Sequence, residues 1–324
     1  MNRMRIWKIF KRIYMIAGSF CVGMALLLGG LRLWREQTEP LAHWSPEYSR
    51  EELQAVAEKK VLSEEEYRFL FYQTGLSRRA VERIPLSERM QVLQEAQEAF
   101  FLHPAVSCER STLISWEERN QDRHLPRLWG IQDGDILITF CSHAFGWRNG
   151  HAALVVDARN GQTLEAVVMG QDSCLQETEK WRSYPSFLVL RLRGCFEEQG
   201  SKIAALAMRR GQGIPYGFWQ DFLEHLNGKR QTGTELEQTG GKVAAGELPD
   251  EGSAEAIEFR DTDCSHLIWR IYQSFGVDLD SNGGFFVTPA DIAKSPCLEV
   301  VQMYGIDVDK VCEPERSEKE NETG

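Results

Sequence analysis

A cysteine that opens a predicted helix is the residue in this chain best placed for covalent chemistry. The sequence Asp-Cys-Ser-His at 263–266 precedes apolar residues at helical spacing, which predicts a helix from Cys264 to about Phe275. At a helix N-terminus, unpaired backbone N–H groups and the positive end of the helix dipole stabilise a thiolate, the form that attacks carbonyl carbons. The same groups can bind the oxyanion that follows. Cys264 is therefore a candidate nucleophile with Asp263 as N-cap, although this pattern alone also fits a buried structural cysteine.

His151 and Glu165, which stand far before Cys264 in the chain, could assist this cysteine in catalysis. His151 stands at the start of the apolar run 152–156, and an Asn-Gly turn at 160–161 leads into a second run, 164–168, that contains Glu165. This pattern predicts a β-hairpin. A histidine can take the thiol proton and return it to a leaving group, and a carboxylate beside it can fix the imidazole tautomer and favour imidazolium. His151 and Glu165 are the candidate base and its orienting acid, although each alone is commoner as an ordinary strand residue.

Tyr216 lies in a Gly-Ile-Pro-Tyr-Gly turn at 213–217 and is a second candidate for stabilising the oxyanion; packing is its alternative role. Cys141 and His143 are close in sequence, but they end a predicted strand and have no helix N-terminus behind them. His266 is two residues beyond the cysteine, so on a helix its side chain points away from that thiol. These last three residues are not predicted to act in catalysis.

The spacing of these residues resembles a known enzyme family. Gly-x-Pro-Tyr followed by Asp-Cys-Ser at the start of a helix that ends in Gly-Val is similar to the NlpC-type papain-like cell-wall hydrolases. In that family the cysteine is the nucleophile and the tyrosine lies next to it. The histidine normally follows the cysteine, whereas here Gly150-His151 precedes Cys264 by about 110 residues. The order Gly134-Asp135, Gly150-His151, Cys264 looks like the permuted YiiX/YebB-like branch of papain-like amidases.

The resemblance runs from about Gly134 to Val301 and has two further supports and one departure. Leu-Glu-Ala at 164–166 stands where that branch places the acidic residue, and Thr-Pro-Ala-Asp at 288–291 is similar to a segment typical of it. The Pro-Tyr motif usually continues with Asp, and here it continues with Gly217. The resemblance implies an α+β, circularly permuted papain-like domain with Cys264, His151, Glu165 and Tyr216 in its site.

The N-terminus predicts attachment to a membrane. Five basic residues between positions 3 and 12 precede Ile13 to Leu31, which carries no charge, and Arg32 and Arg35 follow. About 20 apolar residues span a bilayer as a helix, and the charge order places the N-terminus in the cytoplasm and the rest of the chain outside. A cleaved signal peptide and a soluble protein are the alternatives.

Composition divides the whole chain into segments. We predict a basic segment and transmembrane signal-anchor at 1–35, a linker and helical spacer at 36–126, the hydrolase domain at 127–312 with an acidic flexible insert at 227–258, and a disordered tail at 313–324. Within the hydrolase domain, apolar runs predict strands at 135–140, 152–156, 164–168, 187–192 and 298–303, with the first four in an antiparallel meander, and helices at 201–210 and 218–226.

Composition limits the partners. A formal net charge of -11 argues against nucleic acid, and eight cysteines without CxxC or zinc-type spacing predict no metal and no cofactor. We expect a membrane-tethered hydrolase that cleaves amide bonds outside the membrane, with peptidoglycan peptides the substrate class that the resemblance implies. The alternatives are a lipid esterase or acyltransferase of the same fold and a non-catalytic binding module.

Overall fold

The computed structural model describes residues 3–38, 42–110, 114–120, 125–144, 147–194, 197–220, 223 and 258–307. The predicted helix at 218–226 lies largely outside these residues, as does the acidic insert, and the C-terminal tail lies entirely outside them. Within them the chain is α+β, as predicted, with antiparallel sheets and helices.

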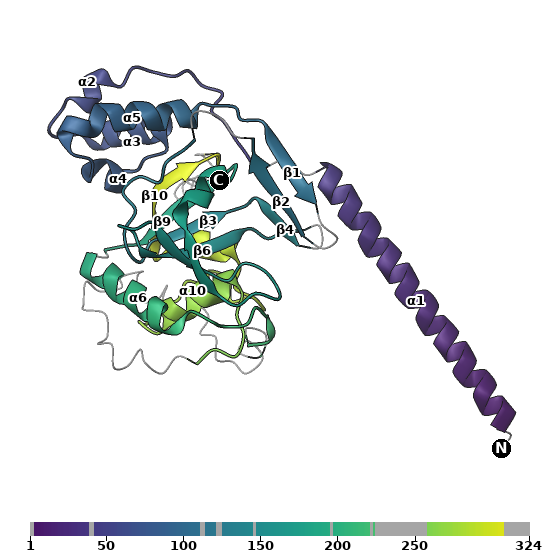
Figure 1. The fold of residues 1–324 in the computed structure, drawn as a ribbon. Helices are drawn as coiled ribbons and strands as arrows, with labels where there is room; N and C mark the ends of the chain where they lie inside the picture. The colour runs from purple at the N-terminus through teal and green to yellow at the C-terminus, as the bar shows by residue number, and fades with distance from the viewer. Residues whose placement is uncertain are drawn as a thin grey trace, which may run out of the picture.

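The helices occur in two groups along the chain, before and after most of the strands (Figure 1). They are α1 (Arg3–Thr38), α2 (Gln54–Ala57), α3 (Glu64–Thr74), α4 (Arg78–Glu82), α5 (Leu86–Phe100), the 3-10 helix η1 (Thr178–Ser183), α6 (Glu197–Arg210), α10 (Cys264–Gln273) and α11 (Pro289–Ala293). Helix α10 begins at the predicted residue and ends two residues before the predicted end.

The described strands form two sheets, both antiparallel. The larger has the order β10-β9-β3-β6-β7-β8, formed by β3 (Ile136–Thr139), β6 (His151–Asp157), β7 (Gln162–Glu165), β8 (Cys174–Glu177), β9 (Phe187–Leu192) and β10 (Leu298–Tyr304). The smaller has the order β1-β2-β4-β5, formed by β1 (Val106–Arg110), β2 (Ile114–Arg119), β4 (Ser142–Ala144) and β5 (Trp147–Arg148).

The predicted meander is correct for three of its four strands. Strands β3, β6 and β7 are consecutive neighbours, and Asn160-Gly161 turns the chain between β6 and β7 as predicted. Strand β9 instead returns to pair with the other edge of β3, where Leu137 lies opposite Val189. Pairing there gives β9 a neighbour on each side, since β10 adds to its far edge.

Strands β1 and β2 were not predicted. They lie inside the segment expected to be a helical spacer, which is helical from α2 to α5 as predicted and then turns into these strands. The alternation in β2 is inverted: Ser115, Glu117 and Arg119 are buried, whereas Ile114 and Trp116 are partly exposed. A polar inward face gives no hydrophobic signal of a strand.

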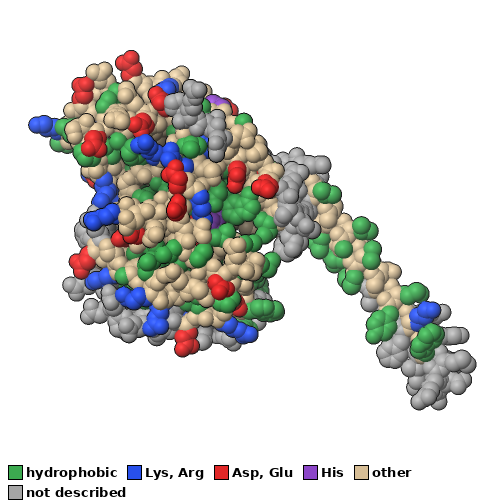
Figure 2. All heavy atoms as spheres, viewed as in Figure 1, with side chains coloured by type: hydrophobic (Ala, Val, Ile, Leu, Met, Phe, Trp, Pro, Cys, Tyr) green, Lys and Arg blue, Asp and Glu red, His purple; other side chains and the backbone are tan. Residues whose placement is uncertain are grey.

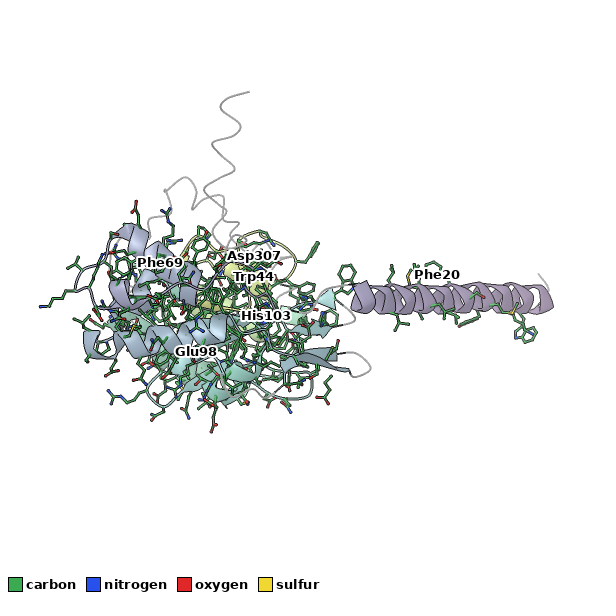
Figure 3. All side chains as sticks on the ribbon, turned by 90° about the horizontal axis from the view of Figure 1, so that it is seen from above. Phe20, Trp44, Phe69, Glu98, His103 and Asp307 are labelled. Carbon is green, nitrogen blue, oxygen red and sulfur yellow. The ribbon has the colours of Figure 1, made fainter. Side chains whose placement is uncertain are left out.

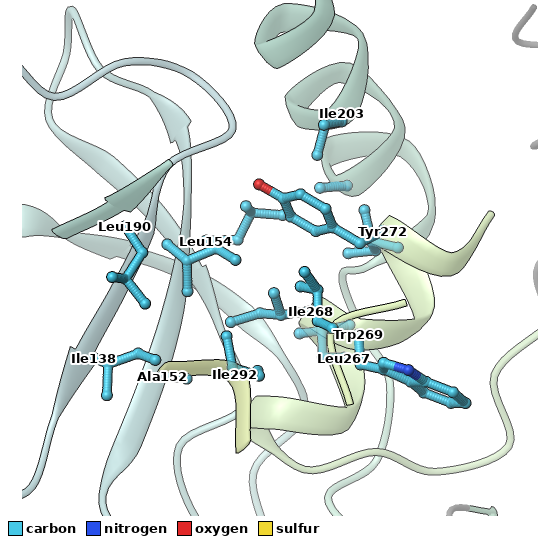
Figure 4. Packing of buried hydrophobic residues seen from close by; sticks show 14 of the residues in the cluster. Ile138, Ala152, Leu154, Leu190, Ile203, Leu267, Ile268, Trp269, Tyr272 and Ile292 are labelled. Atoms are coloured by element: carbon cyan, nitrogen blue, oxygen red, sulfur yellow. The ribbon is translucent and has the colours of Figure 1, made fainter. Parts of the chain in front are cut away.

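The larger sheet carries a hydrophobic layer on each face. On one side Ala152 and Leu154 of β6 pack with Ile268 and Tyr272 of α10 and with α6 (Figure 4). On the other side Leu137, Ala153 and Val155 pack with residues of α3 to α5 and with Trp181. Strand β6 is therefore buried on both faces, which holds its first residue, His151, in a fixed position.

Helix α1 projects from the body, and most of the side chains described on it are exposed, as with Phe20 at 67% (Figures 1 and 3). It contains the segment predicted to span a membrane. Over the residues that the structure describes, none of the helices is both long enough and apolar enough to cross a bilayer.

Candidate active site

Cys264 is the first residue of α10, and the cap of that helix explains its position. The Oδ1 atom of Asp263 accepts hydrogen bonds from the backbone N–H groups of Ser265 (2.9 Å) and His266 (3.0 Å), as an N-cap residue does. The cap leaves the Cys264 N–H without an acceptor among the described residues. Cys264 is only 8% exposed and lines a pocket rather than an open surface.

His151 opens β6 beside this cysteine. Its Nε2 lies 2.6 Å from Oε2 of Glu165, so Nδ1 is the ring nitrogen left for Cys264, which lines the same pocket. Burial alone would lower the pKa of His151. The hydrogen bonds and charges of Cys264 and Glu165 outweigh burial and raise that pKa to about 9. The site therefore favours an imidazolium beside a sulfur atom.

The hairpin register brings Glu165 to His151. Leu154 lies opposite Leu164, so the same register places Glu165 opposite Ala153, two residues from His151 on one face of the sheet. Just before β6, Gly150 has a φ of 79°, and a Cβ atom there would lie 2.6 Å from the carbonyl oxygen of Thr139. Only glycine fits this turn, which fixes how the chain enters the strand.

Glu165 is a buried carboxylate with four donors. Oε2 accepts from His151 and from Lys180 Nζ, both at 2.6 Å, and Oε1 accepts from Thr163 Oγ1 at 2.6 Å and from Trp181 Nε1 at 3.2 Å. Burial raises the pKa of Glu165, but the hydrogen bonds and positive charges of His151 and Lys180 lower it to about 2. Glu165 is therefore ionised at neutral pH and orients the imidazole.

Aromatic rings enclose the imidazole. Trp181 stacks on His151 with ring centroids 5.8 Å apart at 21°, and Trp116 meets it edge-on at the same centroid distance. Tyr184 stacks on Trp116 and meets Trp181 edge-on. These rings exclude water from the pair His151–Glu165, which strengthens its electrostatic attraction.

Tyr216 is positioned by the segment that leads into the cysteine helix. It forms a parallel bridge with Thr262: the Gly217 N–H donates to the Thr262 carbonyl (2.9 Å), and the Thr262 N–H donates to the Pro215 carbonyl (3.0 Å). Burial, together with the charges of Cys264 and Asp263, raises the pKa of Tyr216. The phenol therefore stays protonated and lines the same pocket as Cys264.

The departure from the family motif at Gly217 has a steric reason. A Cβ atom at this position would lie 2.8 Å from Cβ of Asp261, so an aspartate cannot be placed there without moving Asp261. The Asp261 carboxylate itself occupies this place and accepts a hydrogen bond from the Gln220 N–H at 3.0 Å. The chain thus has a carboxylate beside the Pro-Tyr turn, supplied from a different residue.

Three of the four predicted site residues, Cys264, His151 and Tyr216, line one pocket of about 350 Å³, and Glu165 contacts His151 without lining it. Its other walls are largely apolar. They come from strand β2, from the segments that follow β7 and the Pro-Tyr turn, and from the segment between α10 and α11 with the start of α11: Ile114, Trp116, Val167, Phe218, Phe286, Val287 and Pro289. Hydrophobic side chains gather on the side of the body nearest α1 (Figure 2). Among the described residues, no group of His, Cys, Asp and Glu is arranged to hold a metal ion.

The structure also locates the other residues that the sequence analysis considered. Thr288 and Asp291 form a capping box at the start of α11, which explains the Thr-Pro-x-Asp segment as a helix start. His266 is buried, with Nδ1 3.0 Å from Thr262 Oγ1, and it does not line the pocket. Cys141 is a buried thiol whose pKa is raised by burial to about 12. His143 lines the pocket.

Sequence reasoning missed Lys180, Trp181, Thr163 and Trp116. Thr163 had a usable signal, because it is two residues from Glu165 on the same face of a predicted strand. The other three are brought in by η1 and β2, whose positions relative to His151 depend on chain folding over long distances. No family model, curated protein or solved structure matches this chain.

Proposed function

We propose that this protein is a thiol hydrolase in which Cys264 is the nucleophile, His151 the base and Glu165 the residue that orients it. The observation that supports this most directly is the buried pair of His151 and Glu165, 2.6 Å apart, in the same pocket as a cysteine at a helix N-terminus. A non-catalytic binding module has no need of such an arrangement. The circularly permuted papain-like architecture belongs to the same proposal and rests on the order of these residues in the sequence.

In the first step His151 Nδ1 takes the thiol proton, and the thiolate attacks the carbonyl carbon of the substrate, forming the C–S bond. The carbonyl oxygen becomes an oxyanion, for which the Cys264 N–H and the Tyr216 hydroxyl are the available donors. His151 then gives its proton to the leaving nitrogen as the C–N bond breaks. A thioester on Cys264 remains.

In the second step water attacks the thioester carbonyl. His151 accepts a proton from the water, the C–S bond breaks, and the carboxylic acid leaves as the thiolate returns. Glu165 keeps its charge throughout and stabilises the imidazolium each time it forms, as the acid of a serine-protease triad does.

The first substrate candidate is an amide bond in cell-wall peptides, which rests on the resemblance of the motifs. The second is the acyl bond of a lipid, through hydrolysis or transfer, and the apolar lining of the pocket favours it: Phe218, Phe286 and Val287 lie beside Cys264. Attachment to the outer face of a membrane through the uncharged segment at 13–31 is part of the proposal and rests on the sequence.

A short pulse of an iodoacetamide fluorophore at pH 6.5 tests the nucleophile. The wild type and Cys108→Ala, which removes a partly exposed thiol on β1, should label equally, and Cys264→Ala should lose most of the signal. Labelling of Cys264→Ala at the wild-type rate would refute the assignment. Incubation of both proteins with peptidoglycan fragments and with phospholipid vesicles, followed by mass spectrometry, then distinguishes the two substrate classes.

A further inference from the structure

A second histidine–glutamate pair lies in the wall of the same pocket. On the smaller sheet, Glu117 of β2 is 2% exposed and His143 of β4 is 6% exposed, and Nε2 of His143 lies 3.6 Å from Oε1 of Glu117. Arg148 of β5 donates to that same oxygen at 2.9 Å, and the Ala42 N–H donates to the other oxygen. Arg148 and Ala42 thus hold the carboxylate in place, and it lies within ion-pair distance of the imidazole.

The position of His143 relative to the catalytic histidine is set by backbone hydrogen bonds. The Ser142 carbonyl accepts from the N–H groups of Asn149 (3.0 Å) and Gly150 (3.2 Å), and Gly150 is the residue immediately before His151. Ser142, His143 and Asn149 all line the pocket. Strand β4, which carries His143, is therefore hydrogen-bonded to the residue just before β6.

Aromatic rings and polar groups are unevenly distributed over the described lining, although Ile114, Trp116 and Ala144 also lie on the sheet that carries His143. Near the cysteine helix are Tyr216, Phe218 and Phe286, whose rings meet edge-to-face, and Val287, whose carbonyl accepts from the hydroxyl of Ser265. Near the start of β6 are the polar groups Ser142, His143 and Asn149. A leaving group departs toward the general acid that protonates it, which places it on the side of His151.

We propose that His143, positioned by Glu117, is a substrate-binding residue for the leaving group and for the acceptor that replaces it. It hydrogen-bonds the amine or alcohol that departs in the first step and, by microscopic reversibility, the water, amine or alcohol that attacks in the second. This inference rests on the proposed thiol-hydrolase function and adds that His143, with Ser142 and Asn149, supplies polar groups on the side of the leaving group.

The second step needs no reactant other than the thioester and the acceptor. The acceptor oxygen or nitrogen forms a bond to the thioester carbonyl carbon, its proton passes to Nδ1 of His151, and the C–S bond breaks to return the Cys264 thiolate. His143 transfers no proton in this step; it orients the acceptor. Loss of one such hydrogen bond should slow the step about 3- to 10-fold.

Turnover of p-nitrophenyl butyrate by the full-length protein separates the two steps. p-Nitrophenolate is a good leaving group that needs no proton, so the burst that accompanies acylation of Cys264 is independent of His143. We expect His143→Phe to keep the burst amplitude and rate while its steady-state rate falls about 3- to 10-fold, with water and with added ethanolamine as acceptor. His143→Gln keeps a hydrogen-bond donor and should recover part of the loss.

Trp147→Ala is the matched control, because Trp147 lies on the same hairpin, is exposed and does not line the pocket. It should behave as wild type. A His143→Phe protein with an unchanged steady-state rate overturns the inference while leaving the thiol-hydrolase proposal standing. So does one in which the burst and the steady state slow equally and the melting temperature falls, because that indicates a structural role. A wild type without a Cys264-dependent burst on this ester or on the substrates above contradicts both proposals.

Discussion

Replacing Lys180 with methionine should raise the pKa of His151 further. Lys180 Nζ and His151 Nε2 each lie 2.6 Å from the same oxygen of Glu165, so the two positive charges share one carboxylate. The ammonium stabilises the carboxylate but repels the imidazolium. Without the ammonium, His151 is the one charged partner of Glu165 among its described contacts, and Thr163 and Trp181 remain as neutral donors.

The magnitude follows from this geometry. Two 2.6 Å contacts to one atom keep the nitrogens within about 5 Å of each other, where unit charges repel by about 3 kcal/mol at an effective dielectric constant of 20. Lys180 is 27% exposed, so solvent reduces this repulsion. We expect the pKa of His151 to rise by about one unit from its value of about 9.

The assay is the pH titration of the ring nitrogens of His151 by NMR with 15N-labelled histidine, assigned with His151→Gln. Lys180→Arg keeps the charge and should stay close to wild type, and Lys202→Met removes a lysine whose partner, Glu198, is exposed on α6. A decrease in the His151 pKa in Lys180→Met, or equal shifts in Lys180→Met and Lys180→Arg, would refute the reasoning. Because a raised pKa keeps the imidazolium at higher pH, the basic limb of the activity profile should move upward with it.

Three other changes have outcomes that the structure specifies. Cys264→Ala should lower the pKa of His151 from about 9, because burial remains while the hydrogen bond and charge of the thiol are lost; the same titration measures it. Asp263→Ala removes the cap of α10 and should cost about 1 to 2 kcal/mol in urea unfolding, with Cys264 labelling slowed; unchanged stability would contradict the cap assignment. Gly150→Ala should destabilise the fold by about 1 to 3 kcal/mol and reduce turnover at least 10-fold, because its Cβ would meet a β3 carbonyl next to His151. Gly170→Ala has a similar φ and open space around it, so thermal melting of this control separates backbone strain from the collision.

The residues that could be predicted are those whose signals are local. Asp263 before an apolar helical pattern identified the first residue of α10, because a cap and a 3.6-residue period are properties of adjacent residues. Asn160-Gly161 identified the hairpin, and the hairpin register brings Glu165 to His151. The roles proposed for Cys264, His151 and Glu165 follow from their residue types and from their places on these elements.

The parts that could not be predicted depend on segments distant in sequence. Lys180 reaches Glu165 from a 3-10 helix, and Trp116 reaches His151 from a strand more than 30 residues earlier. Strand β2 also turns its polar residues inward, where Glu117 pairs with Arg148 and faces His143, so hydrophobic patterning gives the wrong face.

The sequence by itself therefore determined a candidate nucleophile at a helix start, a candidate base at a strand start and a candidate acid across a hairpin. Only the tertiary structure decided that they meet, that a lysine shares the carboxylate, and that a second histidine joins the pocket wall. The physical reason is that capping, periodicity and turn geometry act between neighbours in the chain. Burial, charge sharing and pocket shape arise only when separate elements pack together.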